Sequence, residues 1–250
     1  MNAPLLQLTG VTKTFGGIHA LSAVTGEVPE GRIIGIIGPN GAGKTTLFNV
    51  VTGAYRADAG EVRLNGAALT GRPPYQIVRK GIARTFQNIR LFNSMTVFEH
   101  LLVAQPHSES WWRRLLPVGW GDPAAKNRAE EVMAFFGLSD LRDRSAGSLP
   151  YGLQRKVEMA RAVTARPKLL LLDEPVAGMN HDEAEEVRRL MLRLRATGLT
   201  ILLIEHDMNF VMRLCDYLYV LDFGVLIAQG TPQEIRRNPV VLDAYLGKEE

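Results

Sequence analysis

The sequence has few cysteines and little excess charge, two features that would mark disulfide-rich or nucleic-acid-binding proteins. It contains one cysteine, Cys215, so no disulfide can form within the chain. This residue lies in an apolar stretch, where we expect it to fill core space, and the chain fits a reducing compartment. Lys and Arg total 29 against 26 for Asp and Glu, and so small a surplus gives no reason to expect a nucleic-acid partner.

Long hydrophobic runs are also absent. The longest apolar runs, such as residues 169–172 and 201–204, are far shorter than the roughly 20 residues of a membrane span. The first residues have neither the basic start nor the apolar centre of a signal peptide, so we expect a chain that is soluble when isolated. With 250 residues, 46% of them hydrophobic, one large domain or one domain with an inserted subdomain is expected.

Three short apolar runs predict buried strands, at residues 32–37, 168–172 and 200–204. Leucines and charges at helical spacing predict a helix over residues 182–195, between the second and third strands. This order of strand, helix and strand favours right-handed crossovers in a mainly parallel sheet, and therefore an α/β fold. The first 30 residues, together with the segment Gly60–Leu64, predict strands that form an antiparallel β edge.

The middle of the chain has a different pattern. Residues 92–166 predict mostly helices, with a stretch rich in Pro, Gly and Trp at residues 105–123. We therefore expect a single domain over residues 1–250. Its α/β core is formed by residues 1–91 and 167–250, and a helical subdomain is inserted between them.

One glycine-rich segment carries the strongest chemical signal. Gly38-Pro-Asn-Gly-Ala-Gly-Lys-Thr45 fits the pattern G-x-x-x-x-G-K-[ST] between a predicted strand and a predicted helix. Glycines let backbone N–H groups wrap around phosphate oxygens, and the helix points its positive end at the anion. Lys44 is expected to supply charge to the β and γ phosphates, and Thr45 to hold Mg²⁺. The segment predicts binding and hydrolysis of ATP.

Two acids end the second predicted strand. Ligands of open α/β sheets bind at the carboxyl ends of the strands, where Asp173 and Glu174 stand. We predict that Asp173 binds Mg²⁺, directly or through water, and that Glu174 activates the attacking water as a base. Acids after a strand also occur as helix caps, but the upstream phosphate loop favours the catalytic interpretation. The third strand ends in a similar way, and His206 is expected to reach the γ-phosphate.

Further motifs resemble those of ABC-type ATPases, in the same order. The segment from Ser148 to Ala162 resembles the signature and its helix, and Thr85-Phe-Gln87 resembles the Q-loop. Val176-Ala-Gly-Met-Asn180 looks like the D-loop, His206 like the switch histidine, and Phe15 like the aromatic that stacks on adenine. The resemblance covers essentially the whole chain and implies a P-loop NTPase fold of the ABC type.

The resemblance also implies additional site residues. Gln87 would contact both Mg²⁺ and the attacking water, which makes it a catalytic residue beside Glu174 and His206 and a metal ligand beside Thr45 and Asp173. The nucleotide-binding residues implied are the adenine-stacking aromatic, the phosphate loop and the signature: Phe15, Gly38, Pro39, Asn40, Gly41, Ala42, Gly43, Lys44, Thr45, Thr46, Tyr151, Gly152, Leu153 and Gln154.

One subgroup of the family is more similar still. Residues 84–92, 149–152, 204–208 and 235–247 look like the ATP-binding subunits of branched-chain amino acid importers. The long segment at 104–125 is similar to the longer of the two ATPase subunits in those systems. Related importers for urea, amides or aromatic acids use very similar subunits, so the solute stays open.

Two positions depart from the general pattern of the family. Pro150 stands where the signature has a serine whose hydroxyl touches the γ-phosphate, and proline offers neither a hydroxyl nor an N–H. We expect the contact to fall to Gly152 and its neighbours, with the helix dipole from residue 153 onward. Asn180 replaces the D-loop aspartate, which keeps hydrogen bonding and loses the charge.

In this family the signature of one subunit completes the ATP site of another, and this chain has one of each motif. The resemblance therefore implies a dimer with a second ATPase subunit, identical or similar, under two membrane permease subunits, with a solute-binding protein acting indirectly. It implies a peripheral place on the cytoplasmic face of the inner membrane. Trp111, Trp112 and Trp120 fit either contact with membrane subunits or local packing.

Other interpretations fit the sequence less well. The main alternative is a non-transport ABC ATPase that acts as a soluble assembly factor, and the segments similar to the importer subgroup argue against it. A nucleotide sensor without turnover is disfavoured because Glu174 and His206 are both present. Asp222-Phe-Gly224 spells a kinase motif, but it lies between two predicted strands, at 217–221 and 225–228, so we predict a turn there.

Overall fold

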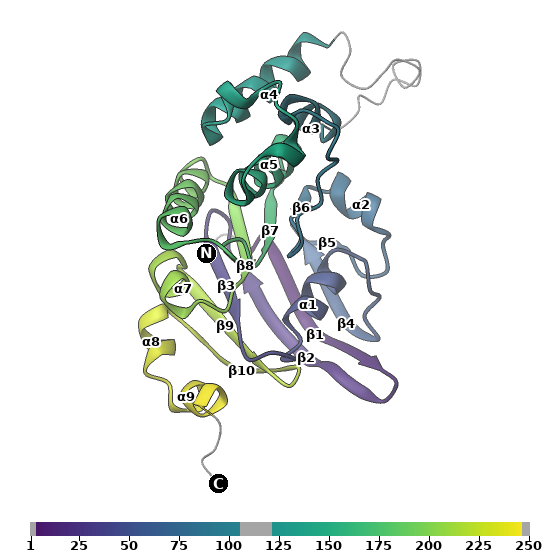
Figure 1. Cartoon of the computed structure of the whole chain (residues 1–250). Helices are drawn as coiled ribbons and strands as arrows, with labels where there is room; N and C mark the ends of the chain where they lie inside the picture. Colours follow the sequence, from purple (N-terminus) through teal and green to yellow (C-terminus); the bar gives the residue numbers. More distant parts are fainter. Residues whose placement is uncertain (1–3, 106–121, 247–250) are drawn as a thin grey trace.

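The computed structural model describes residues 4–105 and 122–246, and its larger sheet forms the centre of the molecule (Figure 1). The six strands have the order β10-β9-β3-β8-β7-β6, and all neighbours are parallel except β10, which is antiparallel to β9. The strands are β3 (Ile33–Ile37), β6 (Ile82–Arg84), β7 (Leu169–Asp173), β8 (Thr200–Ile204), β9 (Tyr217–Asp222) and β10 (Val225–Gly230). The mainly parallel sheet is confirmed, and the three predicted strands match β3, β7 and β8 to within one residue.

The smaller sheet is the antiparallel edge that the sequence predicts. Its order is β2-β1-β4-β5, and all its neighbours pair antiparallel. The strands are β1 (Leu6–Phe15), β2 (Ile18–Val28), β4 (Ala59–Leu64) and β5 (Ala67–Ala68). The carboxyl end of β1 thereby brings the predicted adenine-stacking residue, Phe15, to a hairpin turn.

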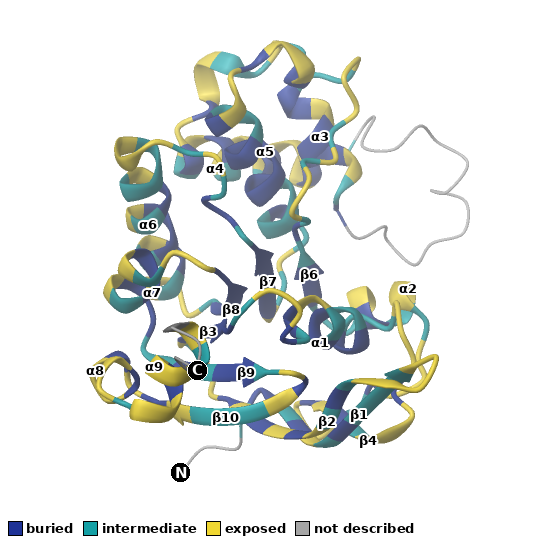
Figure 2. Cartoon of the chain, turned by 60° about the horizontal axis from the view of Figure 1, so that its bottom comes forward, coloured by how far each residue is buried: buried dark blue, intermediate teal, exposed yellow. Residues whose placement is uncertain are grey.

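Helices cover both faces of the larger sheet and form one end of the molecule, where α3, α4 and α5 gather away from the smaller sheet (Figures 1 and 2). None in the described ranges has both the length and the apolar character that crossing a bilayer requires. The α-helices are α1 (Lys44–Val51), α2 (Pro74–Arg79), α3 (Val97–Val103), α4 (Pro123–Phe136), α5 (Tyr151–Thr164), α6 (His181–Ala196), α7 (Met208–Leu214), α8 (Pro232–Arg236) and α9 (Pro239–Leu246).

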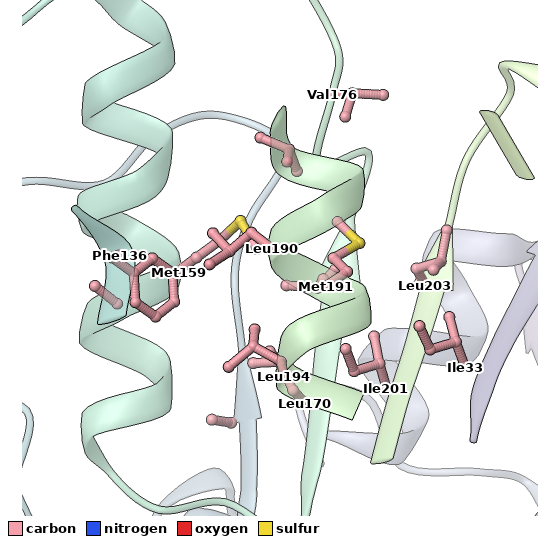
Figure 3. Close-up of a cluster of buried hydrophobic side chains, with 14 of the residues drawn as sticks. Ile33, Phe136, Met159, Leu170, Val176, Leu190, Met191, Leu194, Ile201 and Leu203 are labelled. Atoms are coloured by element: carbon pink, nitrogen blue, oxygen red, sulfur yellow. The ribbon is translucent and has the colours of Figure 1, made fainter. Parts of the chain in front are cut away.

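Alternate side chains of the central strands enter two different cores, as the period of two requires. In β3, Ile34 and Ile36 join a cluster with α1 and the smaller sheet, whereas Ile33 and Ile37 join one with α3 to α7. Figure 2 shows these strands buried, and Figure 3 shows the second cluster, in which Leu190 and other α6 side chains gather between α5 and the strands. Burial on both faces fixes the strand ends from which the site is built.

The described part of residues 92–166 contains helices α3, α4 and α5, two 3-10 turns at Ser139–Leu141 and Ala146–Ser148, and no named strand. The exact division of the chain after residues 91 and 166 stays a prediction. Trp111, Trp112 and Trp120, and most of the segment at 104–125, lie outside the described residues.

Two smaller predictions are confirmed near the end of the chain. Phe223 and Gly224 form the tight turn between β9 and β10, with φ angles of 41° and 78°. The motif that resembles a kinase sequence is therefore a hairpin turn. Cys215 is a free and buried cysteine within the second core, and burial raises the pKa of its thiol, so it fills core space as expected.

Candidate functional site

The loop between β3 and α1 is built by glycines that no other residue can replace without strain. Gly38, Gly41 and Gly43 have φ angles of +148°, +81° and +100°, in the region that glycine favours. A Cβ added to Gly38 would lie 2.0 Å from the carbonyl oxygen of Leu221, and one added to Gly43 would lie 2.4 Å from that of Ala20. The glycines therefore allow this loop to pass close to β9 and β2.

Lys44 closes the loop on itself. Its Nζ donates to the carbonyl oxygens of Gly38, at 2.7 Å, and Pro39, at 2.8 Å, and its side chain is buried. Burial lowers the pKa of the Lys44 ammonium, and the nearby carboxylates of Glu174 and Asp173 partly oppose this shift. A buried ammonium beside two carboxylates gives the loop a positive charge at the position where phosphate is predicted.

Helix α1 begins without a side-chain cap. Gly43 stands at its N-cap position and has no side chain to accept from the first-turn N–H groups. Unsatisfied N–H groups at a helix N-terminus form a natural anion site, and the dipole adds to it. Thr45 is exposed and Thr46 half-buried in this turn, so both lie where a nucleotide phosphate would meet the helix.

Asp173, at the end of β7, is buried and held by Arg84, a residue for which no role was predicted. Arg84 Nη2 donates to Asp173 Oδ2 at 2.8 Å, and its Nη1 donates to Asn49 Oδ1 at 2.6 Å. The guanidinium thus connects β6, α1 and β7. In the described part of the chain, no hydrogen bond reaches the second carboxylate oxygen, Oδ1 of Asp173.

The predicted metal ligands suit Mg²⁺ only together with a phosphate. Among residues 4–105 and 122–246, no three or more His, Cys, Asp or Glu side chains are grouped to hold a metal. Mg²⁺ in phosphate sites takes one or two carboxylates, and phosphate oxygens and water complete its octahedron. The oxygens of Thr45, Gln87 and Asp173 match this requirement in chemical type.

Glu174 follows Asp173 in a strained backbone conformation and meets two of the other predicted catalytic residues. Its φ angle is +48°, and its N–H donates to the carbonyl oxygen of Ile204 at 2.9 Å. Gln87 Nε2 donates to Glu174 Oε2 at 2.8 Å, and His206 Nδ1 lies 3.8 Å from the same oxygen. One carboxylate oxygen is therefore shared by the side chains that the sequence assigned to the γ-phosphate.

Glu205 is a second buried carboxylate beside this group, and sequence reasoning passed over it. It is fully buried, and its two oxygens accept from the N–H groups of Val176, at 3.0 Å, and His206, at 3.1 Å. Burial raises the pKa of Glu205, and these N–H groups partly oppose the shift. Glu205 thereby joins the loop after Glu174 to the loop of His206. Its place directly before His206 was the one available signal.

The signature residues lie apart from the phosphate loop. Tyr151 begins α5 and is 44% exposed, and Pro150 at the N-cap position provides no side-chain cap. The helix starts two residues before the dipole was expected to act. Gln154 Nε2 donates to the carbonyl oxygen of Leu149 at 2.8 Å. Within the described residues, no hydrogen bond or ion pair joins residues 151–154 to the phosphate loop.

Two further predicted positions have local partners. Phe15 is exposed at the end of β1, and its ring centroid lies 5.2 Å from that of Tyr55, in an edge-on arrangement. Lys13 Nζ lies over the Phe15 ring, 5.1 Å from its centroid. Asn180 caps α6, where its side chain accepts from the N–H of Glu183 at 3.0 Å.

Two families match this chain. The family described as "ABC transporter" matches residues 21–177, and the family described as "Branched-chain amino acid ATP-binding cassette transporter" matches residues 225–250. The high-affinity branched-chain amino acid transport ATP-binding protein BraF of Pseudomonas aeruginosa is 43% identical over 256 residues, which cover 99% of this chain and 100% of BraF. The protein of the same description named LivG from Escherichia coli strain K12 is 44% identical over 255 residues, with the same coverage.

Solved structures agree with these matches. A nucleotide-free ATP-binding cassette from an ABC transporter has a TM-score of 0.87 and 36% identity, and covers 98% of this chain and 100% of its own. The ADP conformation of an ATP-binding cassette of an ABC transporter has a TM-score of 0.88 and 35% identity, with coverages of 99% and 100%. The predicted resemblance and fold are confirmed. The chain belongs to the ABC transporter family, as one of its ATP-binding, ATP-hydrolysing subunits.

Proposed function

We propose that this chain is the ATP-hydrolysing subunit that energises an importer of branched-chain amino acids. The observation that carries the proposal is the meeting of Gln87 and His206 on one oxygen of Glu174, beside a glycine loop closed by Lys44. The full-length relatives named as branched-chain amino acid transport proteins, and the matching tail at 225–250, support the solute class.

In the proposed reaction, water attacks the γ-phosphorus of ATP, the bond to the ADP oxygen breaks, and Glu174 accepts the proton of the water. When ATP binds, Lys44 exchanges its bonds to loop carbonyls for the β and γ phosphates. Gln87 orients the Glu174 carboxylate, and His206 contacts the γ-phosphate. Thr45, Asp173 and Gln87 would hold Mg²⁺, which would neutralise part of the phosphate charge.

Two copies of the site require a second ATPase subunit, identical or similar to this one. The exposed Tyr151 and the uncapped start of α5 support this, since Gly152, Leu153 and their neighbours would face the nucleotide of the partner. ATP that binds the closed dimer better than the open one provides the free energy for moving a partner. Two membrane permease subunits, a solute-binding protein acting through them, and a peripheral site on the cytoplasmic face of the membrane complete the proposal.

Hydrolysis is tested with three variants of the purified chain: Lys44→Ala, Glu174→Gln and His206→Ala. Each should reduce ATP hydrolysis by about a hundredfold or more, as removal of a group that acts on the transition state does. Only Lys44→Ala should also weaken binding of ATP. Undiminished rates in all three would remove these residues from the site.

Transport is tested with the whole complex. The chain is purified with its permease subunits, placed in vesicles, and supplied with ATP inside and radiolabelled leucine with the solute-binding protein outside. ATP-dependent uptake that is lost in Glu174→Gln is the expected result. A chain that hydrolyses ATP but never co-purifies with polytopic membrane subunits would instead fit a soluble assembly factor.

A further inference from the structure

Arg155 is the largest fully buried side chain of the described residues, and no role in the reaction has so far been assigned to it. It lies on α5, one helical turn after Tyr151, on the side that faces the α/β core. A buried guanidinium is costly unless its N–H groups are bonded and its charge is paired. The partners of Arg155 therefore indicate what this position achieves.

The guanidinium bonds the backbone of both loops that surround the predicted γ-phosphate. Nη1 donates to the carbonyl oxygen of Phe86 at 2.6 Å, and Nη2 donates to that of Gln87 at 2.7 Å. A longer bond of 3.4 Å runs from Nη2 to the carbonyl oxygen of Glu174. One side chain of the signature helix thus holds the backbone of Gln87 and of Glu174 at the same time.

Glu158, one turn further along α5, completes this arrangement. It is fully buried and pairs with Arg155, whose Nη1 lies 3.0 Å from Glu158 Oε2. Its other oxygen accepts from the N–H of Phe86 at 3.4 Å. Arg155 and Glu158 therefore bond both the carbonyl group and the N–H of Phe86, the residue directly before Gln87.

The same guanidinium reaches the exposed start of the helix. Nη2 lies 3.3 Å from the hydroxyl of Tyr151, and a Cβ at Gly178 would lie 3.6 Å from the Tyr151 ring. Tyr151 therefore stands between Arg155 and the loop that precedes α6. A continuous set of contacts runs from the exposed end of α5 to the carbonyl groups of Gln87 and Glu174.

We propose that Arg155, together with Glu158, is a positioning residue. It couples the backbone positions of Gln87 and Glu174 in one ATP site to the position of the N-terminal end of α5, at Tyr151. This rests on the proposed function, in which the Tyr151 end closes the ATP site of the partner subunit. A shift of α5 on closure of the partner site moves both loops together, because a single rigid, planar group holds them. The two ATP sites of a dimer are thereby coupled through Arg155.

Two variants separate positioning from folding. Arg155→Lys keeps the charge opposite Glu158, but an ammonium lacks the planar fork that joins three carbonyl groups. The double variant Arg155→Met with Glu158→Leu removes both charges of the buried pair, and apolar replacement of such pairs is often tolerated by the fold. Arg161, whose Nη2 lies 3.9 Å from Glu158 Oε1, keeps its bond to the carbonyl oxygen of Arg90. Arg128→Lys is the matched control, since Arg128 lies on α4 and donates to Gln105, away from both loops.

The measurements are the melting temperature, binding of a fluorescent ATP analogue to the isolated chain, and ATP hydrolysis by the complex with its permease subunits. We expect both variants to keep binding within about threefold, while turnover falls about tenfold to a hundredfold, as for a small misplacement of catalytic groups. The Hill coefficient for ATP should fall toward 1. Amides of residues 86–90 should exchange hydrogen faster than in the wild type, and Arg128→Lys should match the wild type in every respect.

Two results would overturn the proposal. Variants with wild-type turnover and Hill coefficient would show that the contacts carry no coupling. Variants that lose melting temperature and ATP binding together with turnover would assign Arg155 to fold stability alone. An inactive wild-type complex, in contrast, would contradict the proposed function and not this inference.

Discussion

Two helices that both begin without a side-chain cap, α1 and α5, are held in place by different means. The start of α1 is fixed by backbone geometry, since Gly43 has a φ angle of +100° and a Cβ added to it would lie 2.4 Å from the carbonyl oxygen of Ala20. The start of α5 follows Pro150, with a φ angle of −54°, and is held through Arg155 by loops distant in the sequence. By contrast, α3, α6 and α8 begin with complete capping boxes.

The difference concerns what each helix start can do. The phosphate loop is closed by its own Lys44, which bonds the carbonyl groups of Gly38 and Pro39, and its glycines let it pass close to β2 and β9. The start of α5 is exposed on one side and bonded to the Gln87 and Glu174 loops on the other. The first arrangement suits rigid binding of an anion, and the second suits a surface whose displacement is transmitted to another site.

The largest effect is expected in the phosphate loop, whose shape depends on the backbone angles of its glycines. Gly43→Ala adds a Cβ that would lie 2.4 Å from a backbone oxygen, so the loop must move. We expect ATP hydrolysis to fall more than about a hundredfold, since such a shift misplaces the phosphates. The left-handed φ angle alone costs about 1–2 kcal/mol.

Gly66→Ala is the control for that strain. Gly66 has a φ angle of +74°, but nothing lies within 4 Å of an added Cβ, and it stands in the turn between β4 and β5. Its melting temperature should fall by a few degrees while its hydrolysis stays near that of the wild type. Equal hydrolysis in the two variants would mean that the loop tolerates the contact with Ala20.

The second-largest effect is expected at Glu205, whose side chain connects two loops of the site. Glu205→Gln leaves one of the N–H groups of Val176 and His206 facing an amide NH₂, and Glu205→Met leaves both without an acceptor. An unsatisfied buried donor costs about 1–3 kcal/mol, and relief of the buried charge offsets part of this. We expect a graded loss of turnover, about tenfold for Gln and more for Met, with little change in KM for ATP.

Steady-state hydrolysis and thermal melting of the three proteins provide the check. If turnover followed the melting temperature alone, Glu205 would be a stability residue. A full rate in Glu205→Met would show that the two loops keep their places without this carboxylate.

The same contrast explains which parts were predictable from the sequence. Strands β3, β7 and β8 and the phosphate loop follow from local patterns, because apolar runs and glycine spacing act within a few residues. Arg84 and Arg155 bond groups distant in the sequence, and Glu205 joins its neighbour His206 to the distant Val176. The residues around them do not indicate these distant partners. Asp173 was predicted as a site residue from its position after a strand, but its pairing with Arg84 depends on the register of β6 beside β7.

A smaller effect concerns the missing cap of α5. Pro150→Ser offers a hydroxyl to the first-turn N–H groups, which contributes about 1 kcal/mol, while loss of proline costs about 0.4–1 kcal/mol through the unfolded chain. The net change should therefore be close to zero. Pro150→Ala loses the proline without gaining a cap, so it should melt about 2–4 °C below Pro150→Ser. Identical melting of the Ser and Ala variants would mean that another group already satisfies these N–H groups.

The smallest effect is expected on α6, where Glu185 is paired with two arginines. Arg188 holds Glu185 through two bonds, of 2.7 and 2.9 Å, and Arg213 adds a third of 2.9 Å. The hydrogen bonds from Arg188, followed by the charges of Arg188 and Arg213, lower the pKa of Glu185 to about 2. Its contribution to stability is therefore present above the ordinary carboxyl pKa of about 4.5 and is lost as pH falls toward 2.

Glu185→Gln should remove this contribution. The gap in melting temperature between wild type and variant should be constant from about pH 6 to 8, shrink below about pH 4.5, and decrease in high salt, because surface ion pairs are screened. ATP hydrolysis should not change. A gap larger than that between the two Pro150 variants, and insensitive to salt, would show that this ion pair anchors α6 against α7. An element outside the site would then also be held in place by contacts between residues distant in the sequence.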